Sequence, residues 1–381
     1  MDVTASTGTE TATGAVAPSE RFRGCLLGGA VGDALGAAVE FKSRAAILEI
    51  FGPDGITDYA PIYGGLGRIT DDTQMTLFTA DGLLRAEVRG CLRGITSYYG
   101  VTAHAYQRWL ATQGIRPRDD VDLDREPGWL YQQRELHARR APGNTCISAL
   151  RTTPSDDGFA QNDSKGCGGV MRVAPVGLFH WSKREYHSAR DTFRLGCQLA
   201  ALTHGHPTGQ LTAGVLAVMI RELVDGASLP KALAVAKTLL REEKHHHETL
   251  RAIELAEDLA AGNMPSEKAI ARLGEGWIAE EALAISLYCA LVARDFRHGV
   301  ILAVNHDGDS DSTGSITGNL LGTLYGVDAI PQQWLESLEL PEVIREIAED
   351  LYEFTSEKWW GDQDLNGQKL EDRIWRQYPG Y

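Results

Sequence analysis

Apolar residues recur along most of the chain at the three- and four-residue spacing of amphipathic helices. The pattern is clearest over residues 211–223, 229–240, 283–291 and 343–354. The alternation of apolar and polar positions that marks a half-buried strand is almost absent. The pattern therefore predicts an all-α fold, with one compact helical domain over residues 21–355.

Two of the expected helices carry a glycine rib, which is a glycine at every fourth position. The ribs are Gly24, Gly28, Gly32 and Gly36 near the amino terminus, and Gly314, Gly318, Gly322 and Gly326 far down the chain. This spacing places the glycines on one helix face, where another backbone can approach closely. We expect the two helices to pack together at the centre of the domain. Glu40 follows the first rib and can reach the start of the second.

Each of two expected helices starts at a cluster of oxygen-bearing side chains. One cluster is Thr70, Asp71 and Asp72, and the other is Asp309, Asp311 and Ser312, with Asp307 close before it. The alternative is that these residues only cap the helices, since Thr, Ser and Asp are preferred caps. However, crowded carboxylates are costly unless a cation neutralises them. We interpret the clusters as two halves of one site, with oxygens enough for two octahedral ions.

Composition limits the class of protein. The 381 residues are 43% apolar, which is enough for a large core. A formal net charge of −15 argues against a nucleic-acid partner, because phosphates are held mainly by Lys and Arg. No apolar run is long enough to span a membrane, and the amino terminus lacks the pattern of a signal peptide. We therefore expect a cytoplasmic protein that binds neither nucleic acid nor membrane.

The two ends of the chain differ from the middle. Residues 1–20 are rich in Thr, Ser, Ala and Gly, and such a segment cannot bury enough apolar surface to order itself. We expect a flexible amino-terminal arm there. Residues 356–381 contain several aromatic side chains, and we expect this tail to pack back on the domain.

Five motifs, in this order, closely resemble the ADP-ribosylglycohydrolases. They are G-C-L-L-G-G-A-V-G-D-A-L-G-A-A-V-E (24–40), T-D-D-T-Q (70–74), G-C-G-G-V-M-R-V-A-P-V-G (166–177), L-T-H (202–204) and G-D-S-D-S-T-G-S-I-T-G-N-L-L-G (308–322). The resemblance covers roughly residues 21–326. It implies an all-α orthogonal bundle with a centre of two Mg²⁺ ions, or Mn²⁺, that grips the ribose hydroxyls of an ADP-ribosyl group.

The resemblance also implies roles for individual residues. The family's metal ligands fall on Thr70, Asp71, Asp72, Asp309, Asp311 and Ser312. Glu40, together with Asp72 and Asp309, takes the catalytic role. The ADP-ribose cleft falls on His204, Gly166, Gly168, Gly169 and Gly314. One position departs from the family, because Cys167 stands where relatives often have Asn.

The implied activity is hydrolysis of the N-glycosidic bond between ADP-ribose and a modified arginine of a protein, which reverses mono-ADP-ribosylation. Some relatives protect bacteria against ADP-ribosylating toxins, so we also predict that this chain acts in immunity and that the arm of residues 1–20 binds a cognate toxin. The alternative is a protein that binds ADP-ribose or occludes a toxin on the same fold without turnover.

Overall fold

A computed structural model describes residues 16–121, 123, 127–152, 158–354 and 365–380. Over these residues the chain is helical, and β-structure is limited to two isolated bridges, Ile62–Gly65 and Gly166–Ile278. The predicted all-α fold is therefore confirmed. Residues 1–15 of the predicted arm lie outside the described residues, whereas residues 18–20 form the first turn of the first helix.

The helices of the first half of the chain are α1 (Pro18–Gly36), α2 (Arg44–Phe51), α3 (Asp71–Arg93), α4 (Tyr98–Thr112), α5 (Gly128–Tyr131), α6 (Asn144–Thr152), α7 (Ala174–Ser182) and α8 (Ala189–Ala201). Those of the second half are α9 (Pro207–Val224), α10 (Leu229–Leu240), α11 (His247–Ala261), α12 (Ser266–Leu273), α13 (Ala279–Val292), α14 (Phe296–Val304), α15 (Ser310–Tyr325), α16 (Gln332–Ser337), α17 (Pro341–Glu353) and α19 (Leu365–Gln377). Short 3-10 turns span Arg134–Leu136, Cys167–Gly169 and Val327–Ala329.

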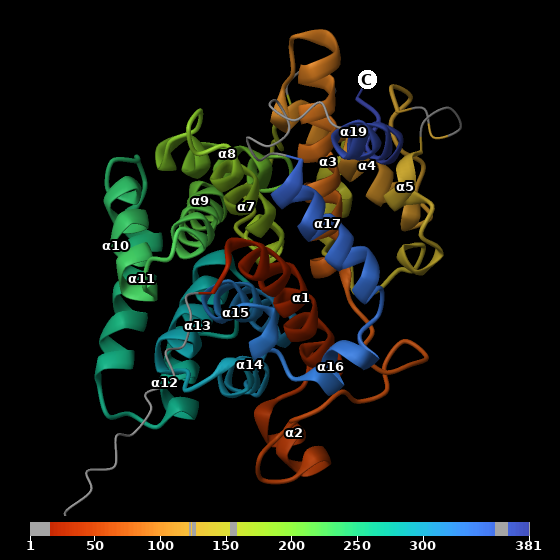
Figure 1. Cartoon of the computed structure of the whole chain (residues 1–381). Coiled ribbons are helices and arrows are strands. Elements are labelled where there is room, and N and C mark those ends of the chain that lie inside the picture. The colour runs from red at the N-terminus through yellow and green to blue at the C-terminus, as the bar shows by residue number, and fades with distance from the viewer. Residues whose placement is uncertain (1–15, 122, 124–126, 153–157, 355–364, 381) are drawn as a thin grey trace, which may run out of the picture.

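The two glycine ribs meet, as the sequence predicted. A Cβ atom added to Gly32 would lie 2.0 Å from the Gly314 carbonyl oxygen, and one added to Gly318 would lie 2.0 Å from the Gly28 carbonyl oxygen. Only glycine allows this backbone approach. Helices α1 and α15 therefore run against each other at the centre of the molecule, between α10 and α11 on one side and α3, α4 and α5 on the other (Figure 1).

The second rib is shorter than the sequence suggested. Helix α15 ends at Tyr325, and Gly326 follows it with a φ of 81°, a backbone conformation that favours glycine. Gly326 therefore ends the helix and does not continue it. It still lies on the contact with α1, because a Cβ atom on Gly24 would come within 2.8 Å of its carbonyl carbon.

The described part of the carboxy-terminal tail contacts the domain through Tyr378. This side chain is fully buried, and its hydroxyl donates a hydrogen bond to Asp350 of α17 at 2.7 Å. Its ring makes an edge contact with Trp129. Residues 355–364 of the predicted tail lie outside the described residues.

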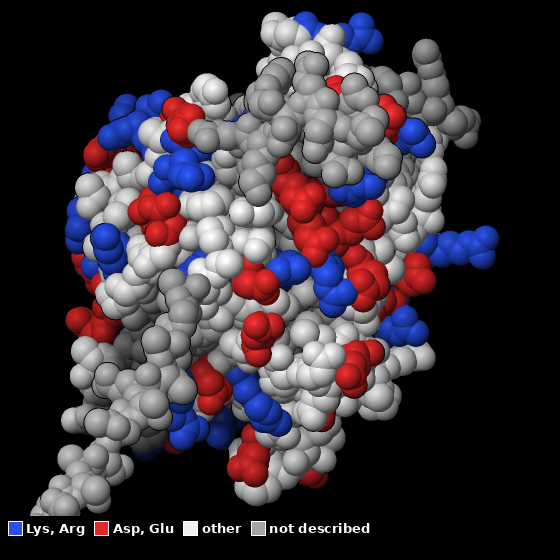
Figure 2. Space-filling model, in the orientation of Figure 1, with Lys and Arg blue, Asp and Glu red and all other residues white. Residues whose placement is uncertain are grey.

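The surface agrees with the acidic composition. Acidic side chains gather over α17, whose sequence contains Glu342, Glu346, Glu349 and Glu353 (Figure 2). Among the described residues, no helix has both the length and the apolar content needed to cross a bilayer. All six cysteines are free thiols.

Candidate functional site

The first half of the site lies at the start of α3. Thr70 is the N-cap of this helix, and its side-chain oxygen accepts a hydrogen bond from the Asp72 backbone N–H at 3.3 Å. Asp71 and Asp72 form the first turn, where the helix dipole favours negative charge. All three residues are buried. The alternative that these residues only cap the helix is therefore correct for Thr70. The carboxylates of Asp71 and Asp72 take no part in this cap.

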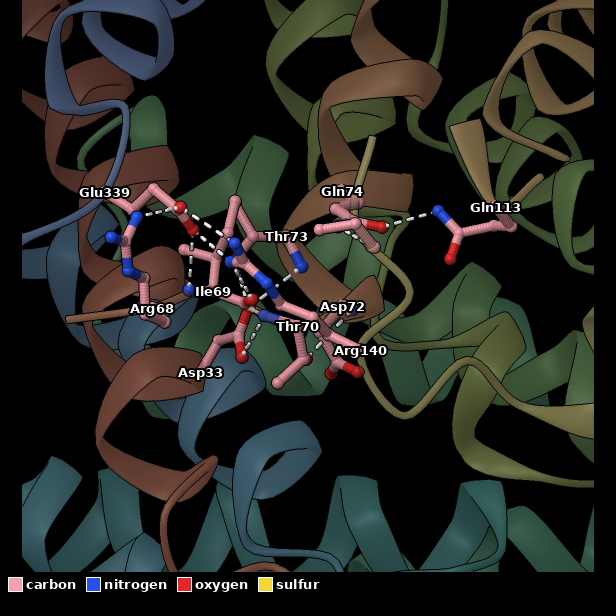
Figure 3. Close-up of polar contacts among 11 residues, drawn as sticks. Asp33, Arg68, Ile69, Thr70, Asp72, Thr73, Gln74, Gln113, Arg140 and Glu339 are labelled. Carbon is pink, nitrogen blue, oxygen red and sulfur yellow. Dashed lines mark hydrogen bonds and ion pairs between the residues drawn. The ribbon is translucent and has the colours of Figure 1, made fainter. Parts of the chain in front are cut away.

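A buried carboxylate that the sequence analysis missed holds this helix start in place. Asp33 of α1 accepts hydrogen bonds from the backbone N–H groups of Thr70 at 3.0 Å and Thr73 at 3.1 Å (Figure 3). Burial and the charge of Asp311 raise the pKa of Asp33 to about 7. The sequence contained one signal for this role, because Asp33 is an acidic residue inside an apolar, glycine-ribbed helix. A charge buried there is costly unless it is hydrogen-bonded.

A buried ionic network fixes the loop that leads into α3. Arg140 forms an ion pair with Glu339 at 2.9 Å and donates a hydrogen bond to the Ile69 carbonyl oxygen at 2.9 Å (Figure 3). Arg68 pairs with the same carboxylate. Arg140 and Glu339, from two distant parts of the chain, thereby hold Ile69, the residue just before Thr70.

The second half of the site lies at the start of α15. Asp309 is the N-cap of this helix, and its Oδ1 accepts a hydrogen bond from the Ser312 backbone N–H at 3.4 Å. Asp311 accepts from the same N–H at 3.0 Å, and all three residues are buried. Asp307 is exposed and accepts from the Arg44 backbone N–H at 2.8 Å. Asp307 is therefore not part of the buried cluster.

Glu40 lies beside the second half of the site. Its backbone N–H donates to the Gly36 carbonyl oxygen at 2.9 Å, in the turn that ends α1. One carboxylate oxygen from each of Glu40, Asp309 and Asp311 lies within 4.8 Å of the other two. The expectation that Glu40 reaches the start of the second glycine rib is confirmed.

Burial and mutual repulsion act on these carboxylates together. The pKa of Glu40 is raised to about 11, first by burial and then by the charges of Asp311 and Asp309. Burial and the charge of Asp311 also raise the pKa values of Asp71, Asp72 and Asp309 well above the ordinary range. The protein has brought together several carboxyl groups that oppose one another's ionisation.

The residues fit a divalent cation. Glu40 Oε2 and Asp72 Oδ1 are buried and have no hydrogen-bond partner, which is rare for a carboxylate oxygen. A cation would supply the missing partner and offset the repulsion. The ligand atoms are carboxylate and hydroxyl oxygens, and hard cations such as Mg²⁺ and Mn²⁺ prefer oxygen ligands.

The acidic cluster borders a pocket of about 330 Å³. Besides Glu40, Asp71, Asp72, Asp309, Asp311 and Ser312, the pocket is lined by residues 141–146, Gly166, Cys167, Gly168, Met171, His204, Phe41 and Trp277. Pockets of about 300–1,000 Å³ are typical of small-molecule sites. Thr70 is fully buried behind this lining.

The predicted cleft residues divide into two groups. Gly166, Gly168 and His204 line the pocket. Gly169 lies outside the lining, where an added Cβ atom would come within 3.1 Å of Ala200. Gly314 packs against α1 and is also outside the lining. The predicted contact of ADP-ribose with Gly169 and Gly314 therefore stays a prediction, and both glycines have a packing role.

His204 enters the pocket as a neutral ring. Burial and the charge of Arg172 lower its pKa to about 3. Its Nδ1 lies 2.8 Å from the Thr203 hydroxyl oxygen, which fixes the orientation of the ring. The ring can therefore form hydrogen bonds without adding a charge to the cleft.

Cys167, the position that departs from the family, contacts the acidic cluster directly. Its Sγ donates a hydrogen bond to Asp309 Oδ2 at 2.8 Å. Burial and the charges of Asp309 and Asp72 raise the pKa of this thiol well above its usual value. The thiol therefore acts as a neutral donor that orients Asp309.

Two parts of the lining were not found by sequence reasoning. Residues 141–146 enter the pocket from the loop before α6 and from the first turn of that helix, and no periodicity or charge pattern marks them. Phe41 and Trp277 stack with ring centroids 5.3 Å apart. An aromatic residue directly after Glu40 was the only available signal for this pair.

Comparison with known proteins agrees with the site. A family profile described as ADP-ribosylglycohydrolase matches residues 15–360. The chain is 28% identical to the ADP-ribosyl-[dinitrogen reductase] glycohydrolase of Rhodospirillum rubrum, over 86% of this chain and 93% of that protein. It is 24% identical to the ADP-ribosylarginine hydrolase Tri1 of Pseudomonas putida, over 88% and 78%. A solved structure titled "ADP-ribosylglycohydrolase-related protein complex" matches with a TM-score of 0.65 and 29% identity, over 89% of this chain and 99% of that one.

Proposed function

The chain belongs to the ADP-ribosylglycohydrolase family, and from this premise we propose that it is a metal-dependent hydrolase that releases ADP-ribose from modified arginine side chains of proteins. The observation that carries the proposal is the buried carboxylate cluster that borders the pocket. The arginine linkage is supported by the relative named as an ADP-ribosylarginine hydrolase.

We assign the metal-binding role to the two helix starts. Two Mg²⁺ ions, with Mn²⁺ as the alternative, would be held by Thr70, Asp71, Asp72, Asp309, Asp311 and Ser312. When bound, such ions hold hydroxyl groups of the ribose and activate a water molecule. Asp33 and Cys167 then serve as positioning residues, because each forms a hydrogen bond with part of this set.

In the proposed reaction, water adds to the ribose carbon while the bond to the arginine nitrogen breaks. The centre passes through an oxocarbenium-like state, and the products are ADP-ribose and unmodified arginine. The unpaired oxygen of Glu40 can move a proton between the water and the leaving nitrogen. Asp72 and Asp309 border the same space and can assist this transfer.

Replacement of a single carboxylate tests the proposal. Asp311→Asn removes a charge from the centre of the cluster, and loss of several kcal/mol of transition-state stabilisation predicts a decrease in kcat/KM of roughly 10²- to 10³-fold. The measurement is release of ADP-ribose from an ADP-ribosyl-arginine peptide in Mg²⁺. Asp307→Asn is the matched control, because Asp307 is exposed in the same loop. Equal activity of Asp311→Asn and wild type would contradict the proposed site.

Calorimetry with ADP-ribose and Mg²⁺ separates this enzyme from a non-catalytic ADP-ribose-binding protein. We expect binding together with release from the peptide. Tight binding of ADP-ribose without any release would favour the binding protein.

Protection against an ADP-ribosylating toxin also stays a prediction. The expected arm lies mainly in residues 1–15, outside the described residues. Its test is complex formation between a cognate ADP-ribosyltransferase and the Asp311→Asn variant, with and without residues 1–15. Equal affinity of the two forms would exclude a role for the arm.

A further inference from the structure

An aromatic pair, one member exposed and the other half-buried, lines the pocket. Phe41 and Trp277 stack with an interplanar angle of 19°, and Phe41 is 70% exposed. Phe41 also has a φ of 63°, in the left-handed region that non-glycine residues rarely adopt. A large apolar side chain kept exposed by a strained backbone contributes little to stability, and such strain is concentrated at functional sites.

Both members of the pair are attached to the acidic cluster. Phe41 directly follows Glu40. Trp277 belongs to a loop that packs on the second half of the site, where the Asp309 backbone N–H donates to the Glu275 carbonyl oxygen at 2.8 Å. The Trp277 carbonyl oxygen accepts from the Cys167 backbone N–H at 3.1 Å. The aromatic pair is therefore fixed beside the carboxylates at one end of the pocket.

The rest of the pocket lining suits the diphosphate part of the substrate. Residues 141–146, which include the start of α6, and the glycines of 166–168 form much of the remaining lining. Backbone N–H groups at a helix start and small residues suit a diphosphate, whereas carboxylates repel one. The diphosphate therefore belongs with these loops. The group on the far side of the glycosidic bond then extends past Glu40 toward the aromatic pair.

Tyr63, an aromatic residue outside the pocket lining, contacts a guanidinium group of this chain. The Arg140 guanidinium carbon lies 5.7 Å from the ring centroid of Tyr63. Burial, followed by the charges of Glu40 and Asp311, raises the pKa of Tyr63 to about 12. Within the pocket, Phe41 and Trp277 add aromatic faces to a lining that is rich in carboxylates.

We propose that the stacked pair Phe41–Trp277 is the subsite for the acceptor side chain, and that it selects the guanidinium group of arginine. A planar cation is attracted both to an aromatic face and to nearby carboxylates, whereas a serine acceptor offers neither charge nor a flat surface. The proposal rests on the proposed hydrolase function and assigns its acceptor specificity to two residues outside the metal-binding set.

The experiment compares two peptides that differ only in carrying ADP-ribose on arginine or on serine. Trp277→Leu should lower kcat/KM for the arginine peptide by about tenfold, mainly through KM, which lies between the scales of an exposed and a desolvated cation–π contact. The preference for arginine over serine should fall with it. Phe41→Leu, which keeps a side chain of moderate size, should act in the same direction. Affinity for free ADP-ribose, measured by calorimetry in Mg²⁺, should stay at the wild-type value.

Two controls separate the subsite from folding effects. Trp277→Phe keeps an aromatic face and should recover most of the arginine preference. Tyr186→Leu removes another exposed aromatic side chain, one outside the pocket lining, and should change nothing.

The outcomes distinguish this proposal from the function on which it rests. If wild type cleaves neither peptide, the proposed function fails and the subsite with it. If wild type cleaves the arginine peptide but the variants keep its full preference, only the subsite is wrong. A parallel loss of affinity for free ADP-ribose would show that the pair binds the nucleotide, which also overturns the proposal.

Discussion

Asp33 shows how one buried side chain positions a site without entering the pocket. It lies on α1, whereas the N–H groups that it accepts from belong to Thr70 and Thr73 at the start of α3. Both carboxylate oxygens take part, and they face N–H donors. A charged acceptor is thus used to hold the helix start that carries Asp71 and Asp72.

Replacement of Asp33 by Asn should lower activity while the fold is retained. The amide of Asn would direct an NH₂ group toward backbone N–H donors, so one hydrogen bond would become a repulsive contact. Substitutions behind the ligands of a metal site typically decrease affinity or activity by about 10- to 100-fold. We expect a decrease of this size in kcat/KM and in Mg²⁺ affinity, measured by kinetics and calorimetry. Asp328→Asn, an exposed charge with no role in the site, is the control.

At the scale of elements, the contact of α1 with α15 aligns the two halves of the site. Helix α1 carries Asp33 and leads to Glu40, and α15 carries Asp311 in its first turn. The backbones are in contact along the glycine ribs, so there is no side-chain layer that could absorb a shift. Any displacement along this contact therefore moves the carboxylates relative to one another.

Gly32→Ala should destabilise the protein and lower its activity together. The added methyl group would meet the Gly314 carbonyl oxygen at 2.0 Å, and backbone cannot move aside as a flexible side chain can. Overpacking of this kind costs about 1–3 kcal/mol or more. Urea unfolding and peptide hydrolysis are the measurements. Gly262→Ala is the control, because its methyl group would have ordinary contacts of 3.4 Å or longer. A Gly32→Ala variant as stable as wild type would contradict the tight contact.

The elements also show what the sequence can predict. The glycine spacing predicted the α1–α15 contact, and cap-forming residues with surplus carboxylates predicted both helix starts, because these signals are local. Residues 141–146 and Trp277 could not be predicted, since their place in the pocket depends on how distant loops fold onto it. Asp33 was missed for the same reason, because its partners are 37 and 40 residues away.

At the scale of the whole molecule, the site joins distant parts of the chain. The start of α3 lies near the beginning of the domain's sequence, and the start of α15 lies near its end. A cation held by both would act as a cross-link, and it would also remove the repulsion among buried carboxylates. Binding to the folded state alone stabilises it by mass action.

Magnesium should therefore raise the thermal stability of the wild-type protein. At about 100 times its dissociation constant, a single bound ion adds about 2.7 kcal/mol to the free energy of unfolding. Thermal melts in Mg²⁺ and in EDTA measure this difference, which should be much smaller for Asp311→Asn and unchanged for Asp307→Asn. A melting temperature that is independent of Mg²⁺ in the wild type would count against a metal site.

The pairing of α1 with α15 also sets the order of events during synthesis. Helix α1 is made well before α15, and the surface that α1 packs against is not complete until Tyr325 has been added. Nearly three hundred residues separate the facing glycines of the two helices, and contacts of such high sequence separation form late in folding. The acidic cluster needs Asp309 and Asp311 beside Glu40 and the start of α3. A chain that is truncated before Asp309 therefore cannot assemble it. Metal binding would then mark a protein whose translation has passed α15.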